Sequence, residues 1–297
     1  MLKPLLALSM LILVLAGCSA TPADNAHDGV IRVVASTNVY GDLAATIGGD
    51  DVEVTSIIDD PSQDPHEFEA NGRVQLALSR ADVVIVNGGG YDDFATTMLD
   101  ASGNDGARVI DAVKLSGYDA SAEGFNEHVW YDYPTVTTVV NAIAAALGIA
   151  DPDHSSEYAV RAQGLVAQLD ALTQLEKGIA AASPDAGVII TEPVPLYALE
   201  AAGLRDLTPP EFSEAIEEGT DASPELLQQV LTEIARPHTA VVVYNEQTGG
   251  PQTDAVLSAA KDAGVPTLGV TETLPAKTHY VEWQEGFLTD LLKDVAG

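Results

Sequence analysis

The chain has 297 residues, of which 45 are acidic and only 13 are basic, so its formal net charge is −32. So negative a protein is excluded from binding nucleic acid, because phosphate recognition needs a basic surface. The charge is compatible with a cation as ligand, and equally with general acidity such as adaptation to high salt. Hydrophobic residues make up 46% of the chain and recur in regular runs, which indicates a packed globular protein.

Residues 1–17 have the pattern of a signal peptide. Lys3 supplies the positive charge, and the apolar run Leu5 to Leu15 is too short to span a bilayer permanently. Leu15-Ala16-Gly17-Cys18 looks like a bacterial lipobox, so we predict that Cys18, the only cysteine, is lipidated and becomes the first residue of the mature chain. The alternative is an ordinary secretory signal with a chance cysteine. Residues 18–29 are mostly small and polar, which predicts a lipidated tether to the membrane.

Apolar, β-branched runs alternate with helical segments along the rest of the chain. The predicted strands are 31–35, 52–58, 83–87, 188–191, 240–245 and 267–271, and the predicted helices include 42–47, 72–79, 135–147, 224–235 and 253–263. Most of the strand runs are apolar throughout, which is typical of strands covered on both faces. The alternation predicts an α/β fold with mainly parallel sheets flanked by helices.

A long helix is predicted in the middle of the chain. Residues 153–182 contain no proline, and their apolar side chains recur at steps of seven, four and three, which makes one apolar stripe. Ser183-Pro184 would end this helix. We therefore predict an N-terminal lobe over 30–152 and a C-terminal lobe over 183–297, joined by a single long rigid helix. The alternative is a long helix packed within one domain.

Two histidines lie in settings that suit metal binding: His66 in DPHEFE and His128 in EHVWYD. Ligands of open parallel sheets bind outside the carboxyl ends of the strands. Glu192 and Glu272 directly follow predicted strands, and His66 follows another across a turn-rich loop. Two imidazoles and two carboxylates can hold a divalent transition metal ion, so His66, His128, Glu192 and Glu272 are the predicted ligands.

Several features of this predicted site stay open. Glu246 directly follows the strand 240–245 and is the alternative fourth ligand. Six donors, with both glutamates binding through two oxygens, would suit Mn²⁺, whereas four donors would satisfy Zn²⁺. The remaining histidines are expected to be structural or at the surface; they are His27, His154, His238 and His279.

The chain resembles a known family in an ordered set of motifs. Besides the lipobox and tether, these are ASTNVYGDLAATIGGD (35–50), DPHEFEA (64–70), HVWYD (128–132), DPDHSSEY (151–158), TEPVPLYALEAAGL (191–204) and GVPTLGVTETLP (264–275). They are similar to those of the metal-binding lipoproteins of bacterial ABC importers for zinc and manganese, the cluster A-I substrate-binding proteins. The resemblance covers essentially everything from Cys18 onward.

The resemblance implies two α/β lobes joined by one rigid helix, with the transported Mn²⁺ or Zn²⁺ held in the cleft between them. It also implies an extracytoplasmic, lipid-anchored protein, expected to be a monomer, that delivers its ion to a membrane permease powered by an ATPase. The family's ligands fall on His66, His128, Glu192 and Glu272. Zinc-dedicated members often carry a histidine where Glu192 stands, and manganese-type members usually carry an aspartate where Glu272 stands.

Two other classes of function remain as alternatives to this binding protein. One is a zinc-dependent hydrolase with two histidines and one glutamate on the metal. We expect no enzyme, because the His-Glu-x-x-His motif is absent and a fourth carboxylate would occupy the open position for water. The other is an adhesin-like surface protein whose metal is purely structural.

Overall fold

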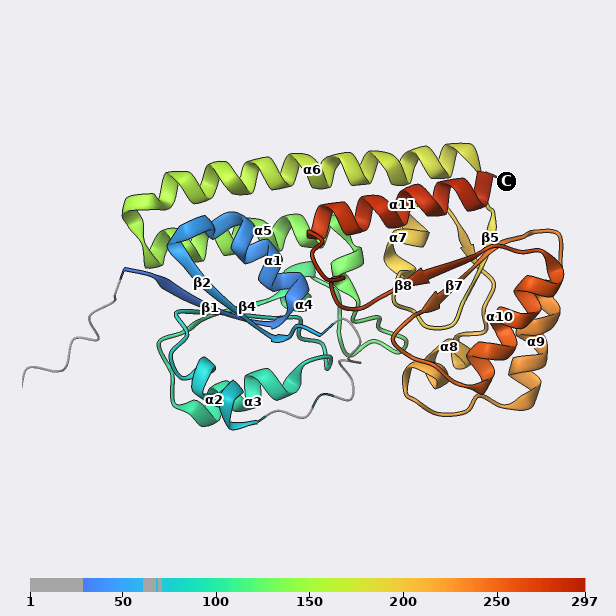
Figure 1. Ribbon diagram of the computed structural model, residues 1–297, viewed down its shortest axis with the longest axis horizontal. Helices are drawn as coiled ribbons and strands as arrows, with labels where there is room; N and C mark the ends of the chain where they lie inside the picture. Colours follow the sequence, from blue (N-terminus) through green and yellow to red (C-terminus); the bar gives the residue numbers. More distant parts are fainter. Residues whose placement is uncertain (1–28, 61–67, 69–70, 297) are drawn as a thin grey trace, which may run out of the picture.

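The computed structural model describes residues 29–60, 68 and 71–296. The predicted signal peptide, Cys18, His27 and His66 lie outside the described residues. Figure 1 shows two lobes side by side beneath the long helix α6 (Ser155–Ala182), which runs along the whole upper side of the molecule. The prediction of two α/β lobes joined by one long helix is confirmed.

The N-terminal lobe is built on a four-stranded parallel sheet in the order β2-β1-β3-β4. Its strands are β1 (Ile31–Thr37), β2 (Val52–Ile58), β3 (Val83–Val86) and β4 (Arg108–Asp111). The order reverses direction between β1 and β3, so this lobe has its topological switch point at the carboxyl ends of these two strands.

The C-terminal lobe repeats the same topology in the order β6-β5-β7-β8, again with all strands parallel. Its strands are β5 (Gly187–Ile190), β6 (Arg205–Asp206), β7 (Thr239–Asn245) and β8 (Thr267–Val270). The corresponding switch point lies between β5 and β7, the two central strands. Polar side chains that follow these strands are therefore expected to meet at one edge of the sheet.

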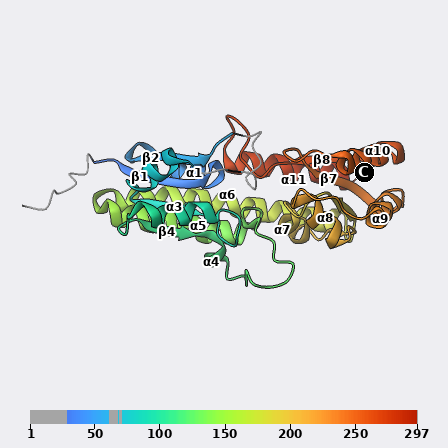
Figure 2. The same cartoon turned by 90° about the horizontal axis from the view of Figure 1, so that it is seen from below.

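Helices cover both faces of each sheet (Figure 1). The N-terminal lobe contains α1 (Asn38–Gly48), α2 (Gly72–Leu78), α3 (Asp93–Ser102), α4 (Ala112–Ser116) and α5 (Tyr133–Ala150), and the C-terminal lobe contains α7 (Leu196–Ala201), α8 (Pro210–Glu217), α9 (Pro224–Ile234), α10 (Pro251–Ala263) and α11 (Tyr280–Ala296). Short 3₁₀ helices are η1 (Gly49–Asp51), η3 (Val129–Tyr131) and η4 (Pro152–His154). Figure 2 shows the loop between α4 and η3 protruding from the N-terminal lobe.

Successive strand residues pack into different cores, which explains the continuous apolar runs. In β7, Val241 and Val243 join the core beneath α6, whereas Val242 joins a second core with α8, α9 and α10. In β1, Val33 faces the core beneath α6 and Val34 faces a third core with α2 and α3. Strands buried on both faces need apolar side chains at every position.

The core beneath α6 is continuous across both lobes. It includes residues of α1 and α5 in one lobe, of α7 and α11 in the other, and the inner face of α6, such as Leu165, Leu172 and Ile179. A shared core of this kind resists bending between the lobes, because close-packed interiors transmit strain. The two lobes are therefore joined by packing along α6 as well as by the chain.

Among the described residues, α5 is the one helix long and apolar enough, by length and composition, to cross a membrane. It packs against α6, α1 and α4, and residues such as Val139, Val140 and Ile143 are fully buried. Asp132 caps its start by accepting a hydrogen bond from the Thr135 amide at 3.2 Å. This packing is that of a core helix.

Candidate metal-binding site

Two buried carboxylates lie side by side at the carboxyl edge of the C-terminal sheet. Glu192 follows β5 and is 3% exposed, and Glu272 follows β8 and is fully buried. Asn245, the last residue of β7, stands between them because β7 pairs with both β5 and β8. Its Nδ2 donates to Glu192 Oε2 at 2.6 Å and to Glu272 Oε1 at 2.9 Å. One neutral amide thus holds two carboxylates together in the protein interior.

Further hydrogen bonds orient the two carboxylates and fix the backbone of Glu272. The Thr248 hydroxyl donates to Glu192 Oε1, and the Gln247 side-chain oxygen accepts the Glu272 backbone N–H at 2.5 Å. Tyr91, in the opposite lobe, donates its hydroxyl to Glu272 Oε2 at 3.1 Å. Burial, together with the charge of Glu272, raises the pKa of the Tyr91 hydroxyl well above its ordinary value, so Tyr91 remains a donor. Glu272 is therefore held from both lobes.

His128 comes from the loop just before η3 and is fully buried. Its Nδ1 lies 2.6 Å from Asn126 Oδ1, and Asn126 Nδ2 donates to the Pro193 carbonyl at 2.9 Å. Because an amide oxygen can only accept, this arrangement puts a ring proton on Nδ1, so Nε2 is the nitrogen that can bind a metal ion once it carries no proton. A neutral imidazole with a fixed orientation is the form that binds a metal ion.

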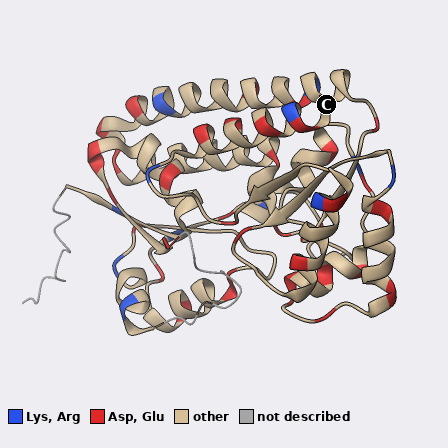
Figure 3. Ribbon diagram, turned by 45° about the vertical axis from the view of Figure 1, so that its right-hand side comes forward, with Lys and Arg blue, Asp and Glu red and all other residues tan. Residues whose placement is uncertain are grey.

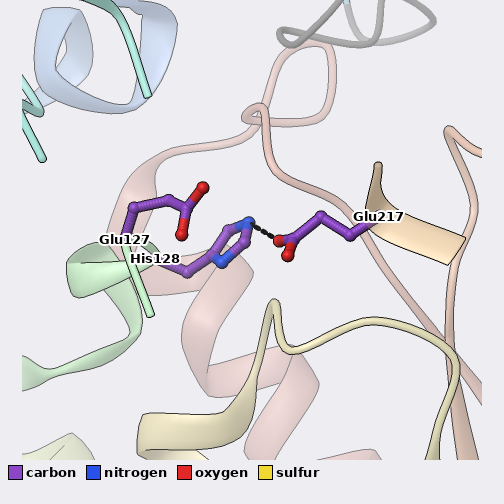
Figure 4. A group of neighbouring side chains, drawn as sticks. All are labelled: Glu127, His128 and Glu217. Atoms are coloured by element: carbon purple, nitrogen blue, oxygen red, sulfur yellow. Dashed lines mark ion pairs between the residues drawn. The ribbon is translucent and has the colours of Figure 1, made fainter. Parts of the chain in front are cut away.

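The Nε2 atom of His128 faces carboxylates from the other lobe. It lies 3.8 Å from Glu272 Oε2 and 3.5 Å from Glu217 Oε1, at the end of α8. Figure 4 shows the His128 ring pointing toward Glu217, with the Glu127 carboxylate alongside. One ligand atom from each of Glu127, His128 and Glu217 lies within 4.8 Å of the others, a spacing that could hold a metal ion.

The protonation behaviour of the site reflects crowded negative charge. Burial alone would lower the pKa of His128, but its contact with Glu272 and the charges of Glu217, Glu272 and Glu127 outweigh burial and raise it. Burial also raises the pKa of Glu192, and the charge of Glu272 adds to this effect, while hydrogen bonds from Thr248 and Asn245 oppose it. A divalent cation would remove the cost of keeping these carboxylates together in a low-dielectric interior.

A cleft of about 1100 Å³ opens beside this cluster. The N-terminal lobe lines it with Gly89 and residues of the protruding loop, and the C-terminal lobe lines it with residues of 214–221 and 247–253. The described residues that line it include the carboxylates of Glu127, Glu214, Glu217, Glu218 and Asp221, with no Lys or Arg among them. Figure 3 shows Asp and Glu spread over both lobes, so the cleft shares the acidity of the whole molecule.

The structure brings together three of the predicted ligands, His128, Glu192 and Glu272. The fourth, His66, is outside the described residues. Glu246 is exposed. Its carboxylate lies against Gly269 in the edge strand β8 and hydrogen-bonds to Tyr244 in β7. No contact between Glu246 and His128, Glu192 or Glu272 is seen in the described part of the chain.

The remaining described histidines pair with carboxylates of their own. His154 Nδ1 lies 2.6 Å from Asp151, His238 Nε2 lies 2.5 Å from Glu233, and His279 Nδ1 lies 2.7 Å from Asp42. They are partly or largely exposed, at helix ends and loops. They lie outside the cluster formed by His128, Glu192 and Glu272.

Sequence reasoning missed four residues of this site: Tyr91, Asn126, Glu217 and Asn245. Asn245 ends a predicted strand, and the strand-end argument applied to Glu192 and Glu272 could have found it. Asn126 lies two residues before His128, but its role depends on Pro193 in the other lobe. No local signal marks Glu217, which lies at an acidic helix end beside Glu218.

The fold and the site together define a two-lobed α/β protein with buried candidate metal ligands between its lobes.

A family model described as "Zinc-uptake complex component A periplasmic" matches residues 33–293, and the chain belongs to this family. The family membership predicted from the motifs is thereby confirmed. The chain is 23% identical to a putative metal-binding protein of Treponema pallidum (strain Nichols), over 93% of this chain and 91% of that relative. It is 26% identical to the manganese-binding lipoprotein MntA of Halalkalibacterium halodurans, over 89% of this chain and 86% of the relative.

The same architecture occurs in solved structures. The periplasmic zinc-binding protein TroA from Treponema pallidum superposes with a TM-score of 0.76 at 20% sequence identity, covering 91% of this chain and 100% of that chain. At this level of identity the likeness demonstrates a shared fold. The fold of two lobes along one long helix is therefore common to both proteins.

Proposed function

We propose that this protein is the extracytoplasmic substrate-binding component of an ABC importer for a divalent transition metal ion. It captures the ion between its lobes and delivers it to a membrane permease driven by an ATPase. The observation that carries this proposal is the pair of buried carboxylates, Glu192 and Glu272, held by Asn245 beside the Nε2 atom of His128. The metal ion is the transported substrate in this account.

The donor chemistry supports a cation at this point. Two carboxylates balance the charge of a divalent ion, so a loaded site is close to neutral and tolerates burial. We propose His128, Glu192 and Glu272 as ligands, with His66 as the second imidazole. Mn²⁺ and Zn²⁺ are the proposed substrates, and similar proteins described as manganese-binding and zinc-binding support this choice.

We place the protein outside the cytoplasm, anchored through a lipid on Cys18 and working as a monomer. Relatives described as lipoproteins and as periplasmic support this location. A role other than catalysis is supported by the donor set, because a fourth ligand closes the position that a hydrolytic water would need. The matching family is one of uptake components, which supports transport over a purely structural metal.

Metal titration of the purified, metal-stripped full chain tests this proposal. We expect one Mn²⁺ or Zn²⁺ ion per chain to bind reversibly, and the far-ultraviolet circular dichroism to stay unchanged when a chelator removes the ion. A chain that unfolds on metal removal would have a structural metal. Failure to bind either ion, or metal-dependent hydrolysis of esters or peptides, would also contradict the proposal.

A further inference from the structure

The geometry points to Glu217 as an additional ligand of the captured ion, one that raises the affinity for the oxygen-seeking Mn²⁺ more than the affinity for Zn²⁺. This inference rests on the proposed function, because it assumes that the ion sits at His128. It assigns a specificity-determining role to a carboxylate outside the predicted set of His66, His128, Glu192 and Glu272.

The position of Glu217 relative to His128 is the first argument. Glu217 Oε1 lies 3.5 Å from His128 Nε2, closer than the 3.8 Å that separates the same nitrogen from Glu272 Oε2. The Glu217 side chain is only 13% exposed, and its carboxylate reaches His128 from the C-terminal lobe (Figure 4). An ion bound to His128 Nε2 would therefore lie within reach of the Glu217 carboxylate as well as that of Glu272.

The surroundings of Glu217 are the second argument. It is the last residue of α8, where the partial negative charge of the helix C-terminus disfavours a carboxylate. It also faces Glu127, and it lines a cleft whose other charged described residues are all acidic. A carboxylate that lies close to other carboxylates at a helix C-terminus would interact strongly with a bound cation.

Coordination chemistry links this carboxylate to the choice of metal. Zn²⁺ is satisfied by four ligands in a tetrahedron, which His66, His128, Glu192 and Glu272 would supply. Mn²⁺ prefers more ligands and more oxygen among them. A third carboxylate adds an oxygen donor that an ion of higher coordination number uses and a tetrahedral ion does not need. Glu217 would thus offset part of the intrinsic advantage that Zn²⁺ has over Mn²⁺ at such sites.

Glu217→Gln keeps the size of the side chain and removes its charge, and Glu218→Gln is the matched control. Glu218 is the next residue and lines the same cleft, but it is exposed and is not part of the Glu127–His128–Glu217 cluster. The affinities of the metal-stripped full chain for Mn²⁺ and for Zn²⁺ are measured by competition with a metal-sensitive dye. Circular dichroism verifies that each variant is folded.

We expect Glu217→Gln to lower the Mn²⁺ affinity by about tenfold or more and the Zn²⁺ affinity by less than about threefold. Glu218→Gln should change both affinities by less than about threefold, as expected for a screened surface charge. An unchanged Mn²⁺ affinity in Glu217→Gln, or equal losses for both metals, would overturn the inference while leaving metal binding intact. A wild-type chain that binds neither metal would instead reject the proposed function itself.

Discussion

Asn38 and Leu274 exchange two hydrogen bonds that tie the two lobes together beside the candidate site. The Asn38 side chain donates to the Leu274 carbonyl at 2.9 Å and accepts the Leu274 N–H at 2.8 Å. Asn38 begins α1 in the N-terminal lobe, whereas Leu274 lies two residues beyond Glu272 in the C-terminal lobe. The segment that carries Glu272 is thus fastened to the opposite lobe.

A second contact strengthens this connection. Asp42, also in α1, accepts the backbone N–H of Tyr280 at 2.8 Å and pairs with His279. The chain from Glu272 to the start of α11 is therefore anchored on α1 at both ends. Together with the core shared along α6, this anchoring is expected to keep the movement between the lobes small when a metal ion binds.

Replacing Asn38 by alanine should destabilise the protein and loosen Glu272. Loss of two partly buried hydrogen bonds is expected to reduce the free energy of unfolding by about 1–3 kcal/mol, measured by denaturant unfolding. The matched control is Asn141→Ala on α5, whose side chain bonds only within its own helix, to Thr137. Asn141→Ala should stay within about 0.5 kcal/mol of wild type. An equal decrease in the free energy of unfolding of both variants would contradict the proposed role of Asn38 in joining the lobes.

The choice between Glu272 and Glu246 as ligand is tested by a pair of glutamine variants. Glu272→Gln should weaken the binding of Mn²⁺ and Zn²⁺ by about tenfold or more, because a charged ligand is lost from the site. Glu246→Gln should leave both affinities within about threefold, because Glu246 is exposed and lies beside Tyr244. Isothermal titration of both variants distinguishes the two assignments. The opposite result would make Glu246 the ligand.

Asn126 should control the metal affinity through the tautomer of His128. Asn126→Ala removes the acceptor at Nδ1 and is expected to lower metal affinity by about 10–100-fold, as for other partners of metal-binding histidines. Tyr197→Phe is the control, because the Tyr197 hydroxyl donates to the Asn126 carbonyl at 2.7 Å and anchors the same loop without touching His128. Titration with Zn²⁺ would show a much smaller loss in Tyr197→Phe. If both variants lose affinity equally, anchoring of the loop explains the effect.

Glu176, on the inner face of α6, should make stability depend on pH. It is 3% exposed, and burial, together with the charge of Asp132, raises its pKa to about 8. The neutral form is therefore favoured in the folded protein. The stability it contributes is fully present below the unfolded pKa of about 4.3 and is lost as pH rises through about 8.

The Glu176→Gln variant isolates this effect, because glutamine stays neutral at every pH. Its free energy of unfolding should rise relative to wild type between about pH 4.5 and 8, with a slope approaching ~1.4 kcal/mol per pH unit. Denaturant unfolding of the metal-stripped chain across this range measures the difference. Glu157→Gln, at an exposed position of the same helix, is the matched control for the loss of a glutamate charge. A flat difference for Glu176→Gln would mean that Glu176 is already charged in the folded protein.

The central strands and the long helix could be predicted because burial leaves a strong pattern. Strands such as β3 and β5 are buried on both faces, and their apolar runs are visible in the sequence. The edge strands β4 and β6 were not predicted. β4 has only four residues, with Arg108 and Val109 exposed, and β6 has two residues. β4 and β6 carry no continuous apolar run, so their pairing becomes visible only in the folded sheet.

The site could be predicted as far as it follows from strand ends. Glu192 and Glu272 meet because β5, β7 and β8 are neighbours in one parallel sheet. The approach of His128 to these carboxylates depends on how the two lobes pack along α6, which no local pattern encodes. Glu217 reaches His128 only through that same packing. In the sequence it is indistinguishable from a solvated acidic helix end.

Anomalous diffraction from crystals of the metal-loaded protein tests the central claim most directly. We predict one strong anomalous peak between the lobes, about 2.0–2.2 Å from His128 Nε2 and from carboxylate oxygens of Glu192 and Glu272. The peak should be absent from crystals of the His128→Ala variant soaked in the same way. A peak at Glu246 or elsewhere on the surface, with none near His128, would contradict the account.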